Sequence, residues 1–410
     1  MTAHRQHPQD DRPIHPEPAL ATVGVHGGPP PEAVTGAILP PIFQTTTFVQ
    51  EGVGGSPGSG AGNAYTYSRA HNPTVTALET ALAAFEGLPH ARAFATGMAA
   101  ITTLALAALD GGGHVVCSDV VYGGTVRLLD RVLAPLGVAV SYVDTADAEA
   151  VAAALRDETK LVLVETPANP TLKLTDLAAV AAATRHHPAL LAVDNTFLTA
   201  ALQRPAEHGA DVVVYSTTKY VEGHNSTLGG ALALSDRRLL ERVDLVRKTT
   251  GSIQSPLQAW LTLKGLKTLT LRMERHAASA AEIADWLAGR REVANVHYPF
   301  HRSFAQRELA LRQQAAGGGI VSFELVGGLA AAERFCAALR LCRLAENLGA
   351  TETLVTHPAT MTHGDVPAER RRATGIGDGL IRLSVGLEAP RDLVADLDAA
   401  LTACQREVAR

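Results

Sequence analysis

The segment VVVYSTTKY, from Val212 to Tyr220, places a lysine among hydroxyl groups directly after a short apolar run. The run is β-branched, brief and followed by polar residues, which is typical of a buried strand. Lys219 is therefore expected where a strand leaves a sheet. Taken alone, a lysine at a strand end usually extends into solvent. The residues that the fold brings beside Lys219 decide whether its amine does chemistry.

Two preceding apolar runs also end in polar clusters, in LVLVETPANP (161–170) and LLAVDNTF (190–197). If the three runs are parallel strands, their carboxyl ends lie at one edge of one sheet, where such sheets bind ligands. The residues gathered there would be Glu165, Asn169, Asp194, Asn195, Ser216, Thr218 and Lys219. The sequence therefore predicts a site at this edge.

An amine, a carboxylate and a phosphate cradle at one edge suggest pyridoxal 5'-phosphate as a cofactor. A lysine forms a Schiff base with its aldehyde, and a carboxylate such as Asp194 keeps its ring nitrogen protonated. The segment FATGMAAITT starts an apolar helix near Gly97 and Met98, whose backbone N–H groups can face a phosphate. Ser216 and Thr218 can add hydroxyl groups. Each residue also has an ordinary structural reading, as a turn, helix-cap or loop residue.

Length and composition restrict the class of protein. The chain has 410 residues, more than one hydrophobic core usually serves, so we expect two domains. Its four cysteines are scattered, without a C-x-x-C pair or zinc spacing, which fits a reducing cytoplasm and argues against a metal site. The net charge is −5 and no basic stripe stands out, which argues against nucleic acid and membranes as partners. We therefore expect the partner of this protein to be a small-molecule substrate.

The elements that would position the site alternate along the middle of the chain. Apolar runs at residues 114–117, 138–143, 161–164, 190–193 and 212–215 are separated by Ala-rich helical segments. This alternation predicts an α/β fold with a mostly parallel sheet. Asn72-Pro73 is the start signal of a helix with one apolar face. Beyond residue 255, long helical stretches, a strand at 317–325 and a helix from Pro390 predict a smaller α/β domain.

We predict four segments from these patterns. Residues 1–20 lack the apolar core of a secretory signal and are rich in His, Pro and charge, so we expect a disordered leader. An N-terminal arm at 21–62 contains a flexible Gly/Ser-rich loop. A cofactor-binding large domain follows at 63–254, and a C-terminal small domain at 255–410.

Seven motifs make the chain resemble the Cys/Met-metabolism (transsulfuration) family of fold-type I pyridoxal-phosphate enzymes. From about His26 onward, YSRAHNPTVTALE, DVVYGGT, ETPANP, VDNTF, YSTTKYVEGH, GLKTLTLRMERH and LIRLSVGLE occur in the family's order. The resemblance implies an aminotransferase-like large domain with a smaller C-terminal α/β domain. It also implies a homotetramer, a dimer of dimers, that acts on an amino-acid substrate.

The resemblance assigns roles around the cofactor. It implies that Lys219 carries the cofactor, that Asp194 pairs with its ring nitrogen and that Tyr122 stacks on its ring. The further contacts that it implies are Asn169 on the phenolic oxygen, Gly97, Met98, Ser216 and Thr218 on the phosphate, and Tyr67 and Arg69 on the phosphate of a neighbouring subunit.

Other residues that the resemblance places near the substrate bear on the reaction. Arg382 would bind the substrate α-carboxylate through two parallel hydrogen bonds. Without the motif, we would expect Arg382 to be a surface arginine in a strand. Glu346 suits a distal ammonium group, and Gly124 stands where methionine γ-lyases usually carry a cysteine. Together with Arg127, these residues match the cystathionine enzymes. Asn347 replaces a serine common in cystathionine γ-lyases and is more similar to sulfhydrylases.

We therefore expect γ-elimination on a sulfur amino acid, above all the cystathionine γ-lyase reaction. In it Lys219 removes the α-proton and Tyr122 protonates the departing sulfur. Cystathionine γ-synthase is the first alternative, followed by methionine γ-lyase and O-acetylhomoserine sulfhydrylase. A generic aminotransferase is disfavoured by the YSR and GLKTL motifs. A non-catalytic cofactor-binding regulatory protein would be favoured by loss of Lys219 or Asp194, and both residues are present.

Overall fold

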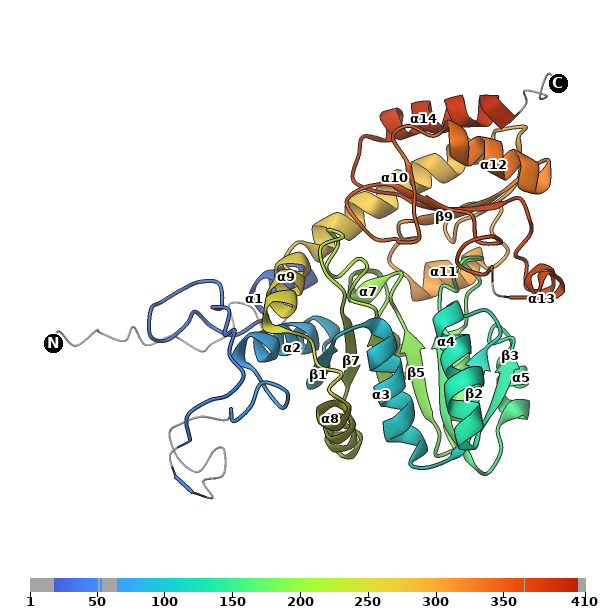
Figure 1. Ribbon diagram of the computed structural model, residues 1–410. Helices are drawn as coiled ribbons and strands as arrows, with labels where there is room; N and C mark the ends of the chain where they lie inside the picture. The colour runs from blue at the N-terminus through green and yellow to red at the C-terminus, as the bar shows by residue number, and fades with distance from the viewer. Residues whose placement is uncertain (1–17, 51, 54–64, 365, 405–410) are drawn as a thin grey trace.

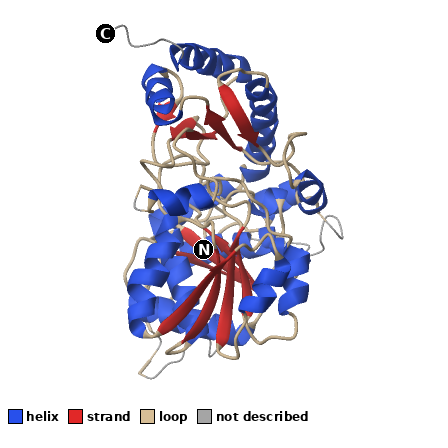
Figure 2. Ribbon diagram, turned by 90° about the vertical axis from the view of Figure 1, so that its right-hand side faces the viewer, coloured by secondary structure: helices blue, strands red, loops and turns tan. Residues whose placement is uncertain are grey.

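Two β-sheets, one of seven strands and one of five, organise the protein. The computed structural model describes residues 18–50, 52–53, 65–364 and 366–404. The predicted leader and the Gly/Ser-rich loop lie almost wholly outside these described residues. Figure 1 shows the larger sheet with its helices below the smaller sheet, and Figure 2 shows helices on both sides of the larger one. The predicted α/β class is confirmed.

The larger sheet has the strand order β1-β7-β6-β5-β4-β2-β3. Its strands are β1 (His90–Phe94), β2 (Gly113–Ser118), β3 (Val138–Val143), β4 (Thr159–Glu165), β5 (Leu190–Asp194), β6 (Val212–Tyr215) and β7 (Gly230–Leu234). β7 runs antiparallel to β1 and β6, and the other neighbours pair in parallel. The five predicted runs are therefore strands of a mostly parallel sheet, because short apolar runs suit strands that are covered on both faces.

Helices cover both faces of this sheet. On one face, α3 (Gly97–Leu109) and α8 (Arg237–Thr250) share a core with residues of β2, β4, β6 and β7. On the other face, α2 (Pro73–Glu86) and α9 (Pro256–Leu266) pack on β1, β6 and β7. Beside them, α5 (Ala148–Ala154) and α6 (Leu177–Thr184) pack on β4 and β5. The shorter elements are α1 (Leu20–His26), α4 (Gly123–Arg127), α7 (Thr199–Leu202), α11 (Arg307–Gln313), a π-helix (Leu128–Leu133) and two 3₁₀ turns (Ala134–Leu136, Pro205–His208).

Polar caps explain where two of the helices begin. The Asn72 side chain accepts a hydrogen bond from the backbone N–H of Thr74 at 2.9 Å, and Pro73 occupies the first helical position of α2. The Thr96 hydroxyl accepts from the N–H of Ala99 at 3.0 Å, so α3 begins at Gly97. The helix start signal at Asn72-Pro73 is thus confirmed, and α3 begins where a phosphate site is predicted.

The smaller sheet has the order β10-β11-β12-β9-β8. Its strands are β8 (Val293–His297), β9 (Ile320–Leu325), β10 (Arg343–Leu344), β11 (Leu354–Thr356) and β12 (Leu380–Ser384). The helices α10 (Leu269–Ala288), α12 (Gly328–Ala338) and α14 (Pro390–Cys404) share a core with it, and α13 (Ala368–Ala373) precedes β12. The first turns of α10 belong instead to the core of the larger sheet. The domain boundary at residue 255 stays a prediction.

Two strands of the larger sheet are absent from the sequence prediction. β1 reads HARAF and β7 reads GALAL, so neither has a β-branched residue. Both are nevertheless strands, because each pairs along its length with a neighbour and β7 is buried throughout. Tertiary pairing therefore overrides weak local propensity here. Within the described residues, no helix is long and apolar enough to cross a membrane.

The N-terminal residues leave the body of the molecule as an arm. Leu20 of α1 packs against the core of the larger sheet, and the chain beyond it extends outward in Figure 1. Along the arm Val34, Ile38 and Val49 each expose more than four-fifths of their surface, with values of 84%, 87% and 87%. Apolar side chains this exposed are unusual when they gather on one segment.

Candidate active site

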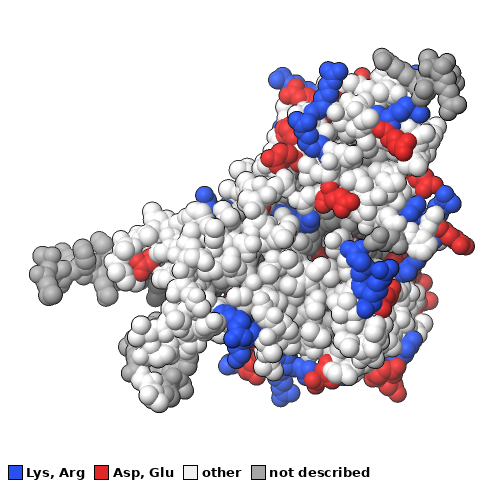
Figure 3. Space-filling model, viewed as in Figure 1, with Lys and Arg blue, Asp and Glu red and all other residues white. Residues whose placement is uncertain are grey.

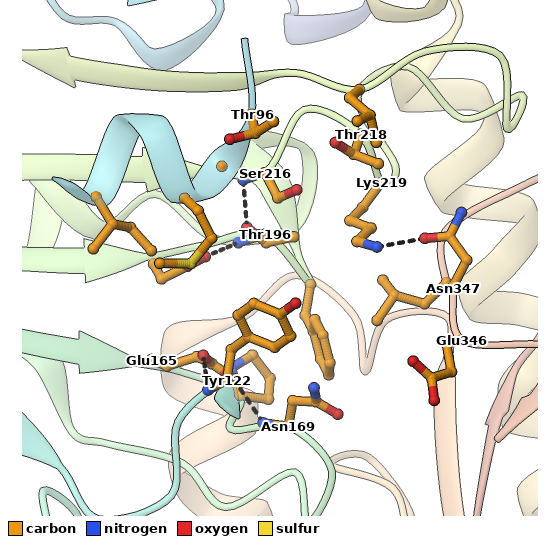
Figure 4. Close-up of a pocket in the computed structure, with 18 of the residues that line it drawn as sticks. Thr96, Tyr122, Glu165, Asn169, Thr196, Ser216, Thr218, Lys219, Glu346 and Asn347 are labelled. Carbon is orange, nitrogen blue, oxygen red and sulfur yellow. Dashed lines mark hydrogen bonds between the residues drawn. The ribbon is translucent and has the colours of Figure 1, made fainter. Parts of the chain in front are cut away.

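A cavity of about 360 Å³ lies at the carboxyl ends of β4, β5 and β6, beside the loop that follows β10. Most of the predicted site residues line it, and Figure 4 shows them converging from both sheets. They are Gly97, Met98, Tyr122, Asn169, Asp194, Ser216, Thr218, Lys219, Glu346, Asn347 and Arg382.

The strand register explains this convergence. Glu165, the last residue of β4, is paired with Asp194, the last residue of β5. Asp194 in turn is paired with Val214 of β6, two residues before Ser216. The cavity gathers the predicted cluster except for Asn195, which donates to the Gln203 carbonyl at 2.7 Å and lies outside the lining. Consecutive residues at a strand end point to opposite sides, so Asp194 and Asn195 cannot both face the cavity.

Lys219 has the environment of a nucleophilic amine. Burial, with a smaller contribution from the positive charge of Arg382, lowers the pKa of its amino group to about 8. A substantial fraction of the amine is therefore neutral near physiological pH, which nucleophilic attack requires. Its Nζ donates a hydrogen bond to Oδ1 of Asn347, as Figure 4 shows.

Two carboxylates, the buried Glu165 and the partly buried Asp194, lie at paired positions on adjacent strands. Burial raises the pKa of both Glu165 and Asp194, and the charge of Asp194 raises that of Glu165 further. Glu165 accepts hydrogen bonds from the backbone N–H of Tyr122 and of Asn169, both at 2.9 Å. Asp194 accepts one from the backbone N–H of Thr196 at 3.0 Å. Glu165 therefore holds two segments of the cavity wall, and Asp194 supplies a carboxylate to the cavity.

The start of α3 forms a close-fitting corner of the cavity. A Cβ atom added at Gly97 would lie 2.8 Å from Cβ of Ser216, so only glycine allows this approach. The Thr196 hydroxyl accepts from the backbone N–H of Ser216 at 2.9 Å, which holds that loop beside the helix. The first N–H groups of a helix lack partners within the helix. This corner therefore suits an anion such as a phosphate.

Arg382 brings a positive charge into the cavity from β12. Only 2% of the residue is exposed. Its Nη1 donates to Oδ1 of Asn169 at 2.9 Å, and its Nη2 donates to Oγ1 of Thr356 and the carbonyl of Asn347, both at 3.0 Å. Its Nε has no hydrogen-bond partner within the described part of the chain. A buried guanidinium with an unused donor suits a carboxylate ligand.

Three predicted site residues do not line this cavity. Tyr67 follows the arm and forms a β-bridge with Thr47, which lies on the arm, and 42% of Tyr67 is exposed. Arg69 packs on the Tyr67 ring and donates to the backbone carbonyl of Lys248 at 3.2 Å. Arg127 ends α4 and is exposed. The predicted roles of Tyr67 and Arg69 therefore require a neighbouring subunit. The predicted role of Arg127 requires a part of the substrate that lies beyond this cavity.

Several lining residues were not singled out from the sequence. Thr96, Thr196 and Phe197 line the cavity, and Glu165 was noticed only as part of the strand-edge cluster. Thr196 and Phe197 could have been identified from their position just after Asp194, at the end of a strand. For Thr96 the signal was a hydroxyl directly before the first glycine of an apolar helix.

Fold and site together define an α/β enzyme class with a lysine amine at the carboxyl edge of its large sheet. The model of the family described as "Cys/Met metabolism PLP-dependent enzyme" matches residues 21–402. The chain belongs to this family, and it is therefore a pyridoxal-phosphate-dependent enzyme of cysteine and methionine transsulfuration metabolism. This confirms the resemblance and the cofactor that the sequence predicted.

Its relatives carry different activities in their names. The cystathionine γ-synthase of Mycobacterium tuberculosis (strain H37Rv) is 44% identical over 381 residues, 93% of this chain and 96% of that one. The cystathionine β-lyase of Lactococcus lactis subsp. cremoris (strain MG1363) is 41% identical over 383 residues, 93% and 99%. The structure of cystathionine γ-lyase from Lactobacillus plantarum, complexed with L-serine, has a TM-score of 0.90 at 39% identity, covering 95% and 100%.

The residues of the cavity fit pyridoxal phosphate. The amine of Lys219, with its lowered pKa, suits the cofactor's aldehyde. The corner at Gly97, where a Cβ atom would collide with Ser216, suits its phosphate. Asp194 offers a carboxylate to a ring nitrogen. The unused Nε donor of Arg382 remains for the carboxylate of an amino-acid substrate.

Proposed function

We propose that this enzyme is a cystathionine γ-lyase, which converts cystathionine and water to cysteine, 2-oxobutanoate and ammonia. The observation that carries the proposal is Glu346, whose carboxylate lines the cavity together with Lys219 and Arg382. Figure 4 shows it on the side that belongs to the smaller sheet. Arg382 suits the α-carboxylate of a substrate, and Glu346 suits the ammonium group at the distal end of cystathionine.

The proposed roles follow from the positions of the side chains. Pyridoxal phosphate supplies an electron sink for the negative charge that develops at the substrate α-carbon. As a neutral amine, Lys219 would take the α-proton, and a second proton lost from the β-carbon then lets the γ-substituent leave. Asp194 would offer a carboxylate to the ring nitrogen, and the N-terminal corner of α3 with Ser216 and Thr218 would hold the phosphate.

Tyr122 is the proposed acid for the departing sulfur. Its backbone N–H donates to Oε2 of Glu165, so the buried carboxylate fixes the loop that carries the ring. The ring itself lines the cavity and is 41% exposed. A phenol held at the cavity wall can transfer a proton to a leaving thiolate.

Cystathionine γ-synthase is the second candidate, because the Mycobacterium tuberculosis relative of that name is 44% identical over nearly the whole chain. In that reaction cysteine replaces the acyl group of an O-acylhomoserine, so the ammonium group near Glu346 would belong to cysteine. Elimination and replacement use the same residues until the side-chain substituent leaves. The cavity residues therefore support both.

One assay separates these activities. The purified enzyme is given cystathionine in one reaction and an O-acylhomoserine with cysteine in another. Release of 2-oxobutanoate in the first alone supports the lyase, whereas new cystathionine in the second supports the synthase. Pyruvate from cystathionine would mean β-elimination, the activity in the name of the Lactococcus relative. A yellow protein that is inactive in every reaction would favour a non-catalytic regulatory role.

We further propose that the enzyme works as a homotetramer built from two dimers. The exposed apolar side chains of the arm, Val34, Ile38 and Val49, suit burial against a second copy. Tyr67 and Arg69 lie outside the cavity of their own chain, which suits a role at the phosphate site of a neighbour. Figure 3 shows acidic and basic residues interspersed over one face of the molecule, which suits neither nucleic acid nor an acidic membrane.

A further inference from the structure

A chain of hydrogen bonds runs from Lys219 to the surface. Nζ of Lys219 donates to Oδ1 of Asn347, as seen in Figure 4. Nδ2 of Asn347 donates to Oδ1 of Asn225 at 2.6 Å, and Nδ2 of Asn225 donates to Oε2 of Glu352 at 3.1 Å. Asn225 and Glu352 are exposed, so these hydrogen bonds connect the half-buried amine of Lys219 to a solvent-facing carboxylate.

The carboxylate of Glu352, at the outer end of this series of hydrogen bonds, determines the direction in which each amide donates. An ionised carboxylate only accepts hydrogen bonds, whereas an amide has a donor end and an acceptor end. Glu352 therefore requires Asn225 to present its NH₂ group outward and its oxygen inward. That oxygen requires Asn347 to present its NH₂ group outward as well. The oxygen of Asn347 must then face Lys219.

The backbone holds both asparagines in place. Asn225 has a φ of +55°, a left-handed conformation that asparagine tolerates better than most residues. The buried carboxylate of Glu222 accepts from the backbone N–H groups of His224 and Ser226 on either side, at 3.1 and 3.2 Å. The carbonyl of Asn347 is bound by Nη2 of Arg382 at 3.0 Å. The backbone at both positions is therefore fixed, and the hydrogen bonds of each side-chain amide decide which way it is turned.

We propose that Asn225 and Glu352 are positioning residues, which fix the amide of Asn347 so that its oxygen holds the amine of Lys219. The inference deepens the proposed function, since it rests on Lys219 acting as a free amine during the reaction. The oxygen accepts from Nζ whether the amine is neutral or charged. A reversed amide would offer a donor, which only the neutral amine can accept.

Other charged and titratable groups also face Lys219 from the surrounding elements. Glu165, Asp194 and Tyr122 come from the large-sheet side of the cavity, and Glu346 and Arg382 come from the small-sheet side. The test leaves all five unchanged. It alters only Asn225 and Glu352, and neither of them lines the cavity.

The experiment reverses the direction of these hydrogen bonds by changing the residue at their outer end. The Glu352→Lys substitution puts a donor-only group beside Asn225, so both amides turn over and Asn347 presents NH₂ to Lys219. The pH midpoint of Lys219 acylation is measured by mass spectrometry on the full chain after the cofactor is removed. We expect the midpoint to fall by about 1 pH unit, the size of one lost hydrogen bond to a charged group.

A second variant restores the direction and serves as the matched control. In Asn225→Asp combined with Glu352→Lys, the new carboxylate accepts from both the introduced ammonium group and Asn347, and aspartate also tolerates a positive φ. The midpoint should return to within about 0.3 unit of the wild-type value. Both measurements are repeated at about 1 M salt, which screens a simple charge effect but leaves hydrogen-bond direction intact.

The proposal is overturned if Glu352→Lys leaves the midpoint unchanged, if the double variant fails to restore it, or if high salt abolishes the shift. Lys219 labelling needs no turnover, so these outcomes are independent of the reaction catalysed. Failure of the cystathionine assay would overturn the proposed function and leave the labelling result intact.

Discussion

The side chains around Lys219 give its amine the properties that its proposed role as a nucleophile requires. Burial and the charge of Arg382 lower its pKa to about 8, while Asn347 holds it by one hydrogen bond. Each of these influences comes from residues far away in the chain: Asn347 is 128 positions from Lys219. The reactivity of this side chain therefore depends on the residues that contact it as well as on its being a lysine.

Replacing this lysine should abolish the reaction without unfolding the protein. In the roles proposed for Lys219, Lys219→Ala removes both the attachment of the cofactor and the proton acceptor, so we expect a loss of at least about 10³-fold in kcat/KM. The visible absorbance of the lysine-bound cofactor should also disappear. Lys248→Ala, on α8, is the matched control and should retain both properties. Activity of Lys219→Ala within tenfold of wild type would point to a different lysine.

Substrate choice is also decided at the scale of the residue. A carboxylate beside the methyl thioether of methionine gains no partner, whereas it pairs with the ammonium of cystathionine. Glu346→Val should therefore raise kcat/KM for methionine and lower it for cystathionine. We expect about three- to tenfold in each direction, a modest value because Glu346 is exposed and its charge is screened.

Glu346→Gln separates charge from shape in this comparison. The amide keeps the size of the glutamate side chain and removes its charge, so it should lose most of the preference for cystathionine. Steady-state kinetics with both substrates provide the measurement. Equal changes for the two substrates in both variants would exclude Glu346 as a determinant of specificity.

At the scale of the element, the meeting of α3 with the loop after β6 shapes the phosphate corner. Gly97→Ala would place a methyl group 2.8 Å from Cβ of Ser216, which forces the two segments apart. Overpacking of this kind costs about 1–3 kcal/mol. We therefore expect cofactor affinity to fall about tenfold or more, measured by equilibrium titration of the cofactor-free chain.

Gly28→Ala is the control for this substitution. An added Cβ there would meet Cβ of Ala81 at 3.7 Å and the carbonyl oxygen of Ala77 at 3.9 Å, which are ordinary contacts. Cofactor affinity should then remain unchanged. If Gly97→Ala binds the cofactor as tightly as Gly28→Ala, the corner at α3 is not the phosphate site.

At the scale of the whole molecule, a buried acid links stability to pH. Glu86, at the end of α2, accepts a hydrogen bond from the Tyr215 hydroxyl, and burial raises its pKa to about 7. The folded state therefore binds a proton that the unfolded state releases near pH 4.5. The stability associated with this proton is complete below about pH 4.5 and is lost as the pH rises through about 7.

Glu86→Gln removes this dependence. Relative to the variant, the wild type should lose free energy of unfolding on the order of 3 kcal/mol between about pH 4.5 and about pH 8. Denaturant unfolding of both proteins at several pH values provides the measurement. Other buried acids titrate equally in both proteins and cancel in the difference. A constant difference across this range would mean that Glu86 is ionised throughout.

The proposed assembly can be tested by mixing inactive subunits. Arg69→Ala lacks the group offered to a neighbour, and Lys219→Ala lacks the group used in its own cavity. If sites are shared, a mixed dimer contains one cavity with both groups intact, and activity should reappear after subunit exchange. A mixture of two Lys219→Ala preparations should stay inactive. Absence of recovery after proven exchange would argue against shared sites.

The sequence by itself determined much of the fold and most of the site. Short β-branched runs predicted five strands of the larger sheet, and Asn72-Pro73 marked the start of α2. Because parallel strands share one carboxyl edge, the polar residues after β4, β5 and β6 could be placed together without coordinates. Asp194 and Lys219 were identified in this way, since each lies at the end of its strand or within a few positions of it.

Only the tertiary structure decided the features that depend on packing between distant segments. β1 and β7 lack β-branched residues, so their strand conformation comes from pairing with each other and with β6. The alternation of side chains at the end of β5 turned Asn195 away from the cavity that Asp194 lines. The chain from Lys219 through Asn347 to Glu352 joins loops of both sheets, and local sequence patterns carry no information about contacts that only the docking of the two sheets creates.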